Sequence, residues 1–305
     1  MTDNKTRAPV SLNVLQPYPD DELSLYELWA VLKAGKKLFF VTLVVLASRG
    51  YSQHNHHVHS EDLPCSVNEQ AEKAYQLNPS LKTQDSLAAI DFEVQYQNYL
   101  ANEYDPFARA TYVIPVVFHV VHLGGPENIS DEQIYDAIEK LNEDYSMTNT
   151  DLSTVITDFQ GVIGNPDIEF RLATKDPNQQ CHPGITRTYS QYTVDDGSGQ
   201  TMNAVAAQHG VWPQNRYLNI FVVSDPNGNA GYTNYPGGWY SPTSMEGGIY
   251  LRHDYCGTIG TGSVSTRRTI SHECAHWLNI RHTWGNSNNA GDAGNCSIDD
   301  LVADT

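Results

Sequence analysis

Two histidines and a glutamate in the segment SHECAHW have the types and spacing that metal-assisted hydrolysis needs. His272 and His276 are four residues apart, so on a helix both imidazoles project from one face and can bind the same ion. Glu273 lies between them and turns away from the ligand pair, as a general base beside a metal-activated water does. The spacing therefore predicts a metal site on a helix, with Glu273 next to the metal rather than bound to it.

A third histidine adds a geometric condition. His282 follows His276 by six residues. On an uninterrupted helix, that separation turns the side chain roughly 120° away and lifts it about 9 Å, out of reach of the same ion. The helix must therefore end at a residue that tolerates a positive φ, and Asn279 is the best such residue after glycine. We expect the chain to turn back there, so that His272, His276 and His282 bind one ion. The alternative is an ordinary amphipathic helix whose histidines only pack and cap.

The segment HECAHWLNIRHTWG, with the later NCSIDDLVADT, resembles the pappalysin family of metzincin metallopeptidases. The stretches YVIPVVFHVVH and YLNIFVV with GYTNYP extend the resemblance over residues 111–305. The resemblance implies a secreted zinc metalloendopeptidase that acts on protein or peptide substrates. Its fold would be an α+β metzincin-like domain, with a twisted mixed sheet, a backing helix and an active-site helix.

The resemblance also implies residue roles. Zinc would be held by His272, His276 and His282, with Glu273 as the general base. Calcium is a second expected ion, because the loop after the third histidine is rich in the hard oxygen donors that Ca²⁺ prefers, although such acidic loops are as often simply solvated. The candidate donors are Asp292, Asn295, Asp299, Asp300 and Asp304.

The chain departs from the metzincin pattern in two places. Asn279 stands where most metzincins have glycine, and the sequence ends at Thr305, before the Met-containing turn that supports the zinc site. We therefore expect a C-terminally incomplete catalytic domain, and a catalytically incomplete zinc-binding or adhesion fragment is the alternative function. A thermolysin-like peptidase needs a downstream glutamate as third ligand, and residues 281–305 contain none.

Several elements are expected to position the site. YVIPVVFHVVH predicts a central buried strand, and ISDEQIYDAIEKLNEDYS predicts an amphipathic helix with a capping box from Ser130 to Gln133. Further strands are expected near Ile168, Leu218 and Ile249, which gives an α+β arrangement. We expect residues 218–223 to be the edge strand that an extended substrate joins.

The N-terminal part predicts export and processing. Residues 36–47, KKLFFVTLVVLA, are too short to cross a bilayer but fit the apolar core of a signal peptide, so residues 1–52 are interpreted as an extension plus signal peptide. The alternatives are a buried strand or helix and a signal anchor with a cytoplasmic tail. Residues 53–109 form the expected pro-segment of short helical pieces, and residues 110–305 the catalytic domain. Arg109 is the candidate processing site.

Five cysteines leave one without a partner in an oxidising compartment. A Cys256–Cys274 bridge is one prediction, and two small buried thiols is the alternative. Cys296 pairs either with Cys181 or beyond this sequence. Cys65, in the pro-segment, is either a plain thiol or a ligand that fills the open zinc position and silences a zymogen.

Charge excludes one class of partner. The chain carries 36 acidic and 18 basic residues, a net charge of −18, whereas nucleic-acid binding needs clustered Lys and Arg. The same balance disfavours stable membrane association after processing.

Overall fold

The computed structural model describes residues 65–102, 111–161, 163–236, 241, 243–285, 287, 288 and 293–297. The expected signal peptide, the histidine-rich HNHHVHS and Arg109 lie outside these residues. None of the described helices is long and apolar enough to cross a membrane. The principal elements, in chain order, are α3 Val67–Leu77, α4 Ser80–Asn102, β1 Tyr112–His122, α5 Asp131–Tyr145, α6 Thr157–Gln160, β2 Ile168–Leu172, β3 Ile185–Tyr189, β4 Val194–Asp195, α7 Gln200–His209, β5 Leu218–Val223, β6 Asp225–Pro226, β7 Gly231–Tyr232, β8 Ile249–Arg252 and α8 Thr269–Trp277.

One mixed sheet organises the domain, in the order β2-β1-β5-β8-β7, with β3 also pairing with β1. All pairings are parallel except β7 with β8, which is antiparallel. The predicted central strand and the strands near Ile168, Leu218 and Ile249 are confirmed. The predicted substrate edge is wrong, because β5 lies between β1 and β8 and both of its sides are already hydrogen-bonded. β7 is the edge strand on this side of the sheet.

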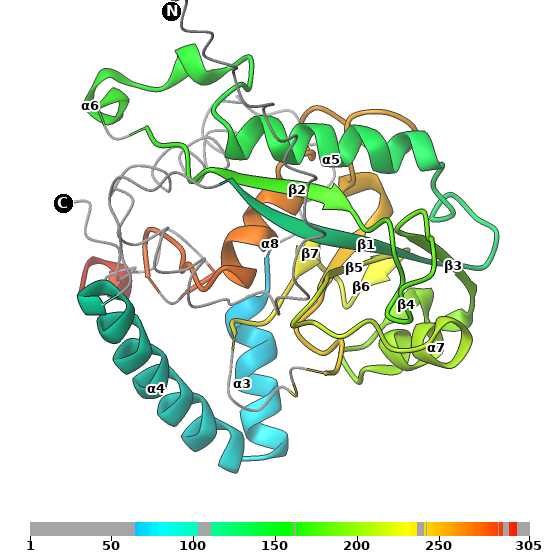
Figure 1. Ribbon diagram of the computed structural model, residues 1–305, viewed down its shortest axis with the longest axis horizontal. Coiled ribbons are helices and arrows are strands. Elements are labelled where there is room, and N and C mark those ends of the chain that lie inside the picture. Colours follow the sequence, from blue (N-terminus) through cyan, green and yellow to red (C-terminus); the bar gives the residue numbers. More distant parts are fainter. Residues whose placement is uncertain are drawn as a thin grey trace, which may run out of the picture.

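The sheet is covered on both faces (Figure 1). Helices α5 and α8 lie over one face, and α7 lies over the other. Neighbouring residues of β1 alternate between two cores, with Phe118 facing α5 and α8 and Val117 facing α7. Each of these side chains is fully buried, which is worth about 2 kcal/mol for a large apolar residue. This two-sided burial explains why the sequence of β1 is continuously apolar.

Helix α5 begins as expected, since the Ser130 hydroxyl accepts a hydrogen bond from the Gln133 backbone N–H at 3.2 Å. The second half of the predicted capping box is replaced by a tertiary contact. The Gln133 side-chain amide instead donates to the carbonyl oxygens of His253 and Cys256, at 3.0 and 2.8 Å. This amide therefore anchors the loop that leads from β8 to α8.

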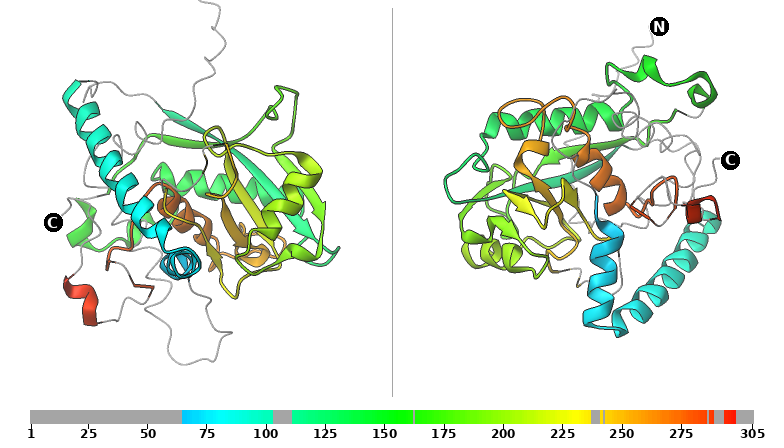
Figure 2. Two further views of the ribbon diagram at one scale, coloured as in Figure 1. Left: turned by 90° about the horizontal axis from the view of Figure 1, so that it is seen from below. Right: turned by 180° about the vertical axis from the view of Figure 1, so that it is seen from behind.

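The N-terminal described segment forms two helices rather than the short pieces expected. Helix α4 has 23 residues, and Figure 2 shows it as an arm that leans away from the sheet, whereas α3 begins close to α8. Only α3 inserts into the domain, where Val67 is fully buried. The start of α3 therefore lies at the site described below.

His119 on β1 predicts an acid-sensitive fold. It is fully buried, its Nε2 donates to the Asn219 side-chain oxygen at 3.0 Å, and its Nδ1 lies 2.7 Å from the Thr186 hydroxyl. Burial lowers its pKa to about 3, with His182 and His209 adding small effects of the same sign. The unfolded chain therefore binds the proton first as pH falls below about 6.5, and stability is lost between that pH and about 3.

We expect the free energy of unfolding to fall by about 2 kcal/mol between pH 7.5 and pH 5 through this histidine alone. Urea unfolding of the parent and of His119→Gln at both pH values measures it. The variant is less stable overall, but its pH-dependent loss should be smaller by that amount. Equal losses in the two proteins would show that His119 does not carry the effect.

Candidate metal centre

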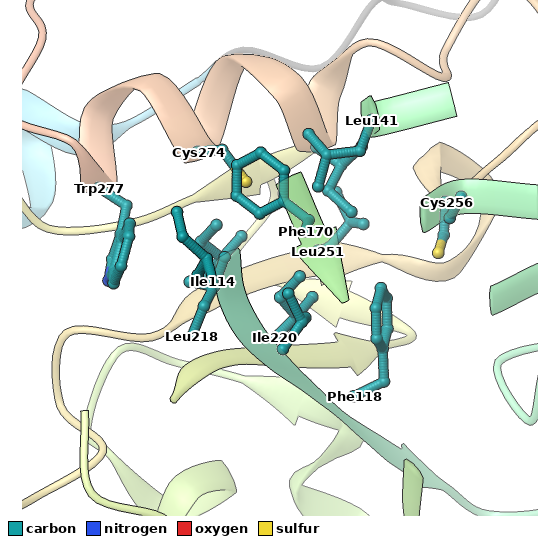
Figure 3. Packing of buried hydrophobic residues seen from close by; sticks show 14 of the residues in the cluster. Ile114, Phe118, Leu141, Phe170, Leu218, Ile220, Leu251, Cys256, Cys274 and Trp277 are labelled. Atoms are coloured by element: carbon teal, nitrogen blue, oxygen red, sulfur yellow. The ribbon is translucent and has the colours of Figure 1, made fainter. Parts of the chain in front are cut away.

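Helix α8 carries the first part of the site. His272, Glu273 and His276 project from its middle and end, and the helix packs against α5 and the sheet (Figure 1). Its other face supplies Cys274 and Trp277 to the core, as Figure 3 shows. This division of faces explains why apolar and chemically active residues alternate within nine residues.

A buried polar network fixes the start of α8 against α5. The Ser271 hydroxyl donates to the Asp144 carboxylate at 2.7 Å, and Arg268 pairs with Asp151 at 2.6 Å and with Asp144 at 3.4 Å. The Tyr145 hydroxyl donates to the Ser271 carbonyl at 3.2 Å. These contacts hold the helix that positions the two histidines, and sequence reasoning did not identify them.

The chain turns back where the ligand spacing requires it. Helix α8 ends at Trp277, and Asn279 has a φ of 67°, which confirms the predicted positive φ. The Asn279 N–H donates to the His276 carbonyl at 2.9 Å, and the Ile280 N–H donates to the Ala275 carbonyl at 3.0 Å. The returning segment places His282 beside the helix.

The three predicted imidazoles converge. The Nε2 atom of His276 lies 3.0 Å from that of His272 and 3.1 Å from that of His282, and the remaining pair is 3.3 Å apart. Three nitrogens in tetrahedral positions around zinc, each at 2.0–2.1 Å, are about 3.3 Å from one another. The spacing therefore fits one zinc ion.

The hydrogen bonds of the other ring nitrogens give a second test of this fit. His276 Nδ1 lies 2.7 Å from the Ile280 carbonyl, and His282 Nδ1 lies 2.9 Å from the Ser287 carbonyl. A carbonyl only accepts, so both Nδ1 atoms carry the proton and both Nε2 atoms present lone pairs. Two facing lone pairs repel unless a cation lies between them, so these contacts are not hydrogen bonds between the rings.

Burial keeps the three rings neutral. It lowers the pKa of His272 to about 3 and the pKa of His282 to about 4, and it lowers the pKa of His276 as well, with the neighbouring rings adding to the effect. A neutral imidazole is the form that binds a metal. The site therefore needs no deprotonation of its histidines at neutral pH.

Glu273 lies beside the three rings and is fully buried. Its Oε1 has no hydrogen-bond partner among the described residues, and its Oε2 lies 3.9 Å from the Cys65 thiol. Burial raises its pKa to about 8, although the Thr233 backbone N–H acts in the opposite direction. The Oε1 oxygen still has its lone pairs free to accept a hydrogen bond from an incoming polar group.

A fourth group completes the cluster. The Cys65 sulfur and the nitrogens of His272, His276 and His282 all lie within 4.8 Å of one another. Cys65 also forms an isolated parallel bridge to Gly231 on β7, which brings the segment before α3 across the edge of the sheet. Of the two roles open for Cys65 in the sequence, this position favours the metal ligand.

The predicted Cys256–Cys274 bridge is absent, and one of the two partners considered for Cys296 is excluded. Cys256 and Cys274 are both buried and free, and they belong to separate parts of the same core (Figure 3). Cys181 is exposed and free, so it does not pair with Cys296. The alternative of small buried apolar side chains applies to Cys256 and Cys274, because each fills space among core residues.

The expected calcium loop lies largely outside the described residues. Asn295 is described, and its side-chain oxygen accepts a hydrogen bond from the Ser287 hydroxyl at 2.8 Å. The other candidate donors, Asp292, Asp299, Asp300 and Asp304, are not among the described residues.

Comparisons with known proteins identify a peptidase family and similar solved structures. A peptidase family model described as pregnancy-associated plasma protein-A matches residues 199–305. Mature mirolysin from Tannerella forsythia, in complex with a cleaved peptide, is 36% identical with a TM-score of 0.56, over 65% of this chain and 72% of mirolysin. A promirolysin variant from the same organism is 31% identical with a TM-score of 0.60, over 79% of this chain and 75% of its own. No curated protein sequence matches the chain.

Fold, site and likeness together define a zinc metalloendopeptidase with a metzincin-type α+β catalytic domain. Within that class, the chain belongs to the pappalysin family.

Proposed function

We propose that His272, His276 and His282 hold the catalytic zinc of this metallopeptidase and that Glu273 is its general base. The observation that carries the proposal is the convergence of three Nε2 atoms beside a buried carboxylate oxygen that has no partner among the described residues. A site that only held a structural ion would not need that carboxylate.

The chemistry follows from these positions. Bound zinc supplies Lewis acidity, which makes water more acidic and polarises the peptide carbonyl. Glu273 accepts a proton from the attacking water as the water oxygen bonds to the carbonyl carbon. Glu273 then gives that proton to the leaving nitrogen as the C–N bond breaks, so the base returns to its starting state.

The edge strand β7 is the proposed place for the substrate. Gly231 lies next to the base, since a Cβ at this position would be 3.3 Å from Glu273 Cγ and 3.1 Å from the Tyr250 carbonyl. A peptide that pairs with β7 as an added strand would pass directly over the site. This placement replaces the interior strand β5 that the sequence suggested.

We propose that the chain is a zymogen in which residues 53–109 form the pro-segment and residues 110–305 the catalytic domain. Cys65 would occupy the fourth zinc position and its segment the substrate's place on β7. The likeness to promirolysin covers 79% of this chain, against 65% for mature mirolysin, which supports an N-terminal pro-segment. Cleavage near Arg109 would release it.

Secretion is part of the proposal. It rests on the two lysines and the apolar run of residues 36–47, which fit a signal peptide ending near residue 52. An extracellular peptidase also accounts for a pro-segment, because the enzyme must stay inactive until it has left the cell that makes it.

The metal assignment predicts the effect of removing the third histidine. His282→Ala should lower zinc affinity at least about 100-fold. Loss of a residue that only supports a metal ligand already lowers affinity about 10–100-fold, and this variant removes a ligand itself. Peptide hydrolysis should fall with the zinc content. Zinc bound after dialysis against a competing chelator, measured by elemental analysis, gives the first quantity.

His209→Ala is the matched control, because a ring nitrogen of His209 lies 3.1 Å from the Arg187 carbonyl and its helix α7 packs on the other face of the sheet. It should retain one zinc per chain. Full zinc content and activity in His282→Ala would exclude His282 as a ligand.

A further inference from the structure

Tyr235 has an unexplained hydroxyl next to the metal centre. It follows β7 by three residues, and its ring packs edge-on against the His276 ring, with centroids 5.4 Å apart and planes at 78°. The hydroxyl oxygen is buried and has no hydrogen-bond partner in the described part of the chain. Neither the proposed zinc ligands nor the base accounts for this group.

Three groups at the metal centre interact electrostatically with the hydroxyl. They are Cys65, Arg281 and Glu273, which are the proposed fourth ligand, a cation from the returning segment and the base. A tyrosine hydroxyl is an O–H donor at neutral pH. The hydroxyl therefore lies near both the proposed base and the proposed pro-segment cysteine.

A buried hydroxyl without a partner destabilises a fold, and such groups are rare in native proteins. When one lies beside a catalytic centre in a latent form, its partner can be the substrate that the latent form excludes. We propose that Tyr235 is a further catalytic residue, whose hydroxyl donates a hydrogen bond to the carbonyl oxygen of the peptide bond being cleaved. This inference rests on the proposed function of the three histidines and Glu273.

The chemistry gives this donor its effect. When water adds to the carbonyl carbon, the π electrons of the C=O bond move to the oxygen, which becomes negative. A hydroxyl that already points at that oxygen makes a stronger hydrogen bond to it as the negative charge grows. The hydroxyl does not have to reorient during the reaction. Tyr235 keeps its proton throughout, while Glu273 carries the proton from water to the leaving nitrogen.

Tyr235→Phe tests the proposal, since it removes only the oxygen. In the full chain activated by limited proteolysis, kcat/KM for a peptide substrate should fall about 100-fold, the usual effect of losing one such donor, with little change in KM. Affinity for a phosphinic peptide, whose tetrahedral oxygens imitate the charged stage, should fall by a similar factor. Inhibition by a small thiol, which has no such oxygen, should change less than about threefold.

Tyr217→Phe is the matched control, because the Tyr217 hydroxyl has a partner, the Lys175 carbonyl at 3.2 Å, and lies in the core on the α7 side. It should lower the melting temperature of the latent chain and leave kcat/KM unchanged. Tyr235→Phe should lower kcat/KM and should not lower the melting temperature of the latent chain. The hydroxyl that it removes makes no hydrogen bond within the described part of that chain.

The outcomes separate this inference from the proposed function. Unchanged kcat/KM and phosphinic peptide affinity in Tyr235→Phe overturn the inference alone, provided that Glu273→Gln is inactive in the same assay. A loss of melting temperature in Tyr235→Phe larger than that in Tyr217→Phe also overturns it, because the hydroxyl would then be structural. An active Glu273→Gln protein would instead remove the proposed function on which the inference rests.

Discussion

Glu273→Gln should abolish peptide hydrolysis while one zinc ion per chain stays bound. Glutamine has nearly the same shape as glutamate, so the helix and the three neighbouring imidazoles are preserved. Its amide cannot take a proton from water at neutral pH. We expect kcat to fall at least about 10³-fold, within the range that a positioned general base supplies.

Casein or a quenched peptide, with the zinc content measured on the same sample, gives both quantities. Glu139→Gln is the matched control, because Glu139 is an exposed residue of α5 whose contact is with Lys140. It should behave as the parent does. If Glu273→Gln retained more than about a tenth of the parent's kcat, the general-base assignment would be wrong.

This comparison also separates the peptidase from the alternative of a catalytically incomplete zinc-binding or adhesion fragment. Such a fragment would bind zinc in both proteins and hydrolyse substrate in neither. The unpartnered Glu273 Oε1 argues for the enzyme, because burying an unpaired carboxylate oxygen is costly and adds nothing to a structural site.

The chemistry-bearing helix could be predicted from the sequence because its constraints are local. A spacing of four residues determines that His272 and His276 share one face, whatever the rest of the chain does. The third ligand required a helix end and a positive φ within six residues, and Asn279 was the residue able to provide it. Few alternative geometries satisfy both conditions.

Which strand lies at the edge of the sheet could not be predicted in the same way. β5 and β1 are both buried and mostly apolar, which indicates an interior strand but does not say which strands flank it. The actual edge, β7, has only two residues, and a segment that short carries no period-2 pattern. Its antiparallel pairing joins Gly231 to Leu251 and Tyr232 to Tyr250, residues that are 18 to 20 positions apart in the sequence.

Two site groups depend on contacts between distant parts of the chain. Cys65 is 208 residues from Glu273, and nothing in its surrounding sequence shows that α3 inserts at the metal centre. Tyr235 is one of 18 tyrosines, and its unpaired hydroxyl becomes visible only once the packing is known. The sequence left Cys65 open between a ligand and a plain thiol, because composition alone cannot decide this.

Cys65→Ala should activate the full-length chain without proteolytic processing. In the proposed zymogen, the bridge to Gly231 keeps the thiol beside the three histidines, where it would compete with substrate at a high local concentration. A tethered group of this kind has an effective concentration in the millimolar range, and we expect its loss to raise hydrolysis by the unprocessed chain on the order of 100-fold. Continuous peptide hydrolysis, with gel analysis to show that the chain stays intact, measures this change.

Cys181→Ala is the matched control, because Cys181 is a free, exposed cysteine outside the metal centre, and it should leave the chain latent. The comparison separates two ways in which the same segment blocks the site. If the intact Cys65→Ala chain stayed inactive but became active after cleavage, Ser66 and Val67, both buried at the start of α3, would block the substrate sterically without help from the thiol. If the intact chain becomes active, binding of the Cys65 sulfur to the metal is the stronger of the two blocks. The contacts of α3 alone are then too weak to keep a peptide away from β7.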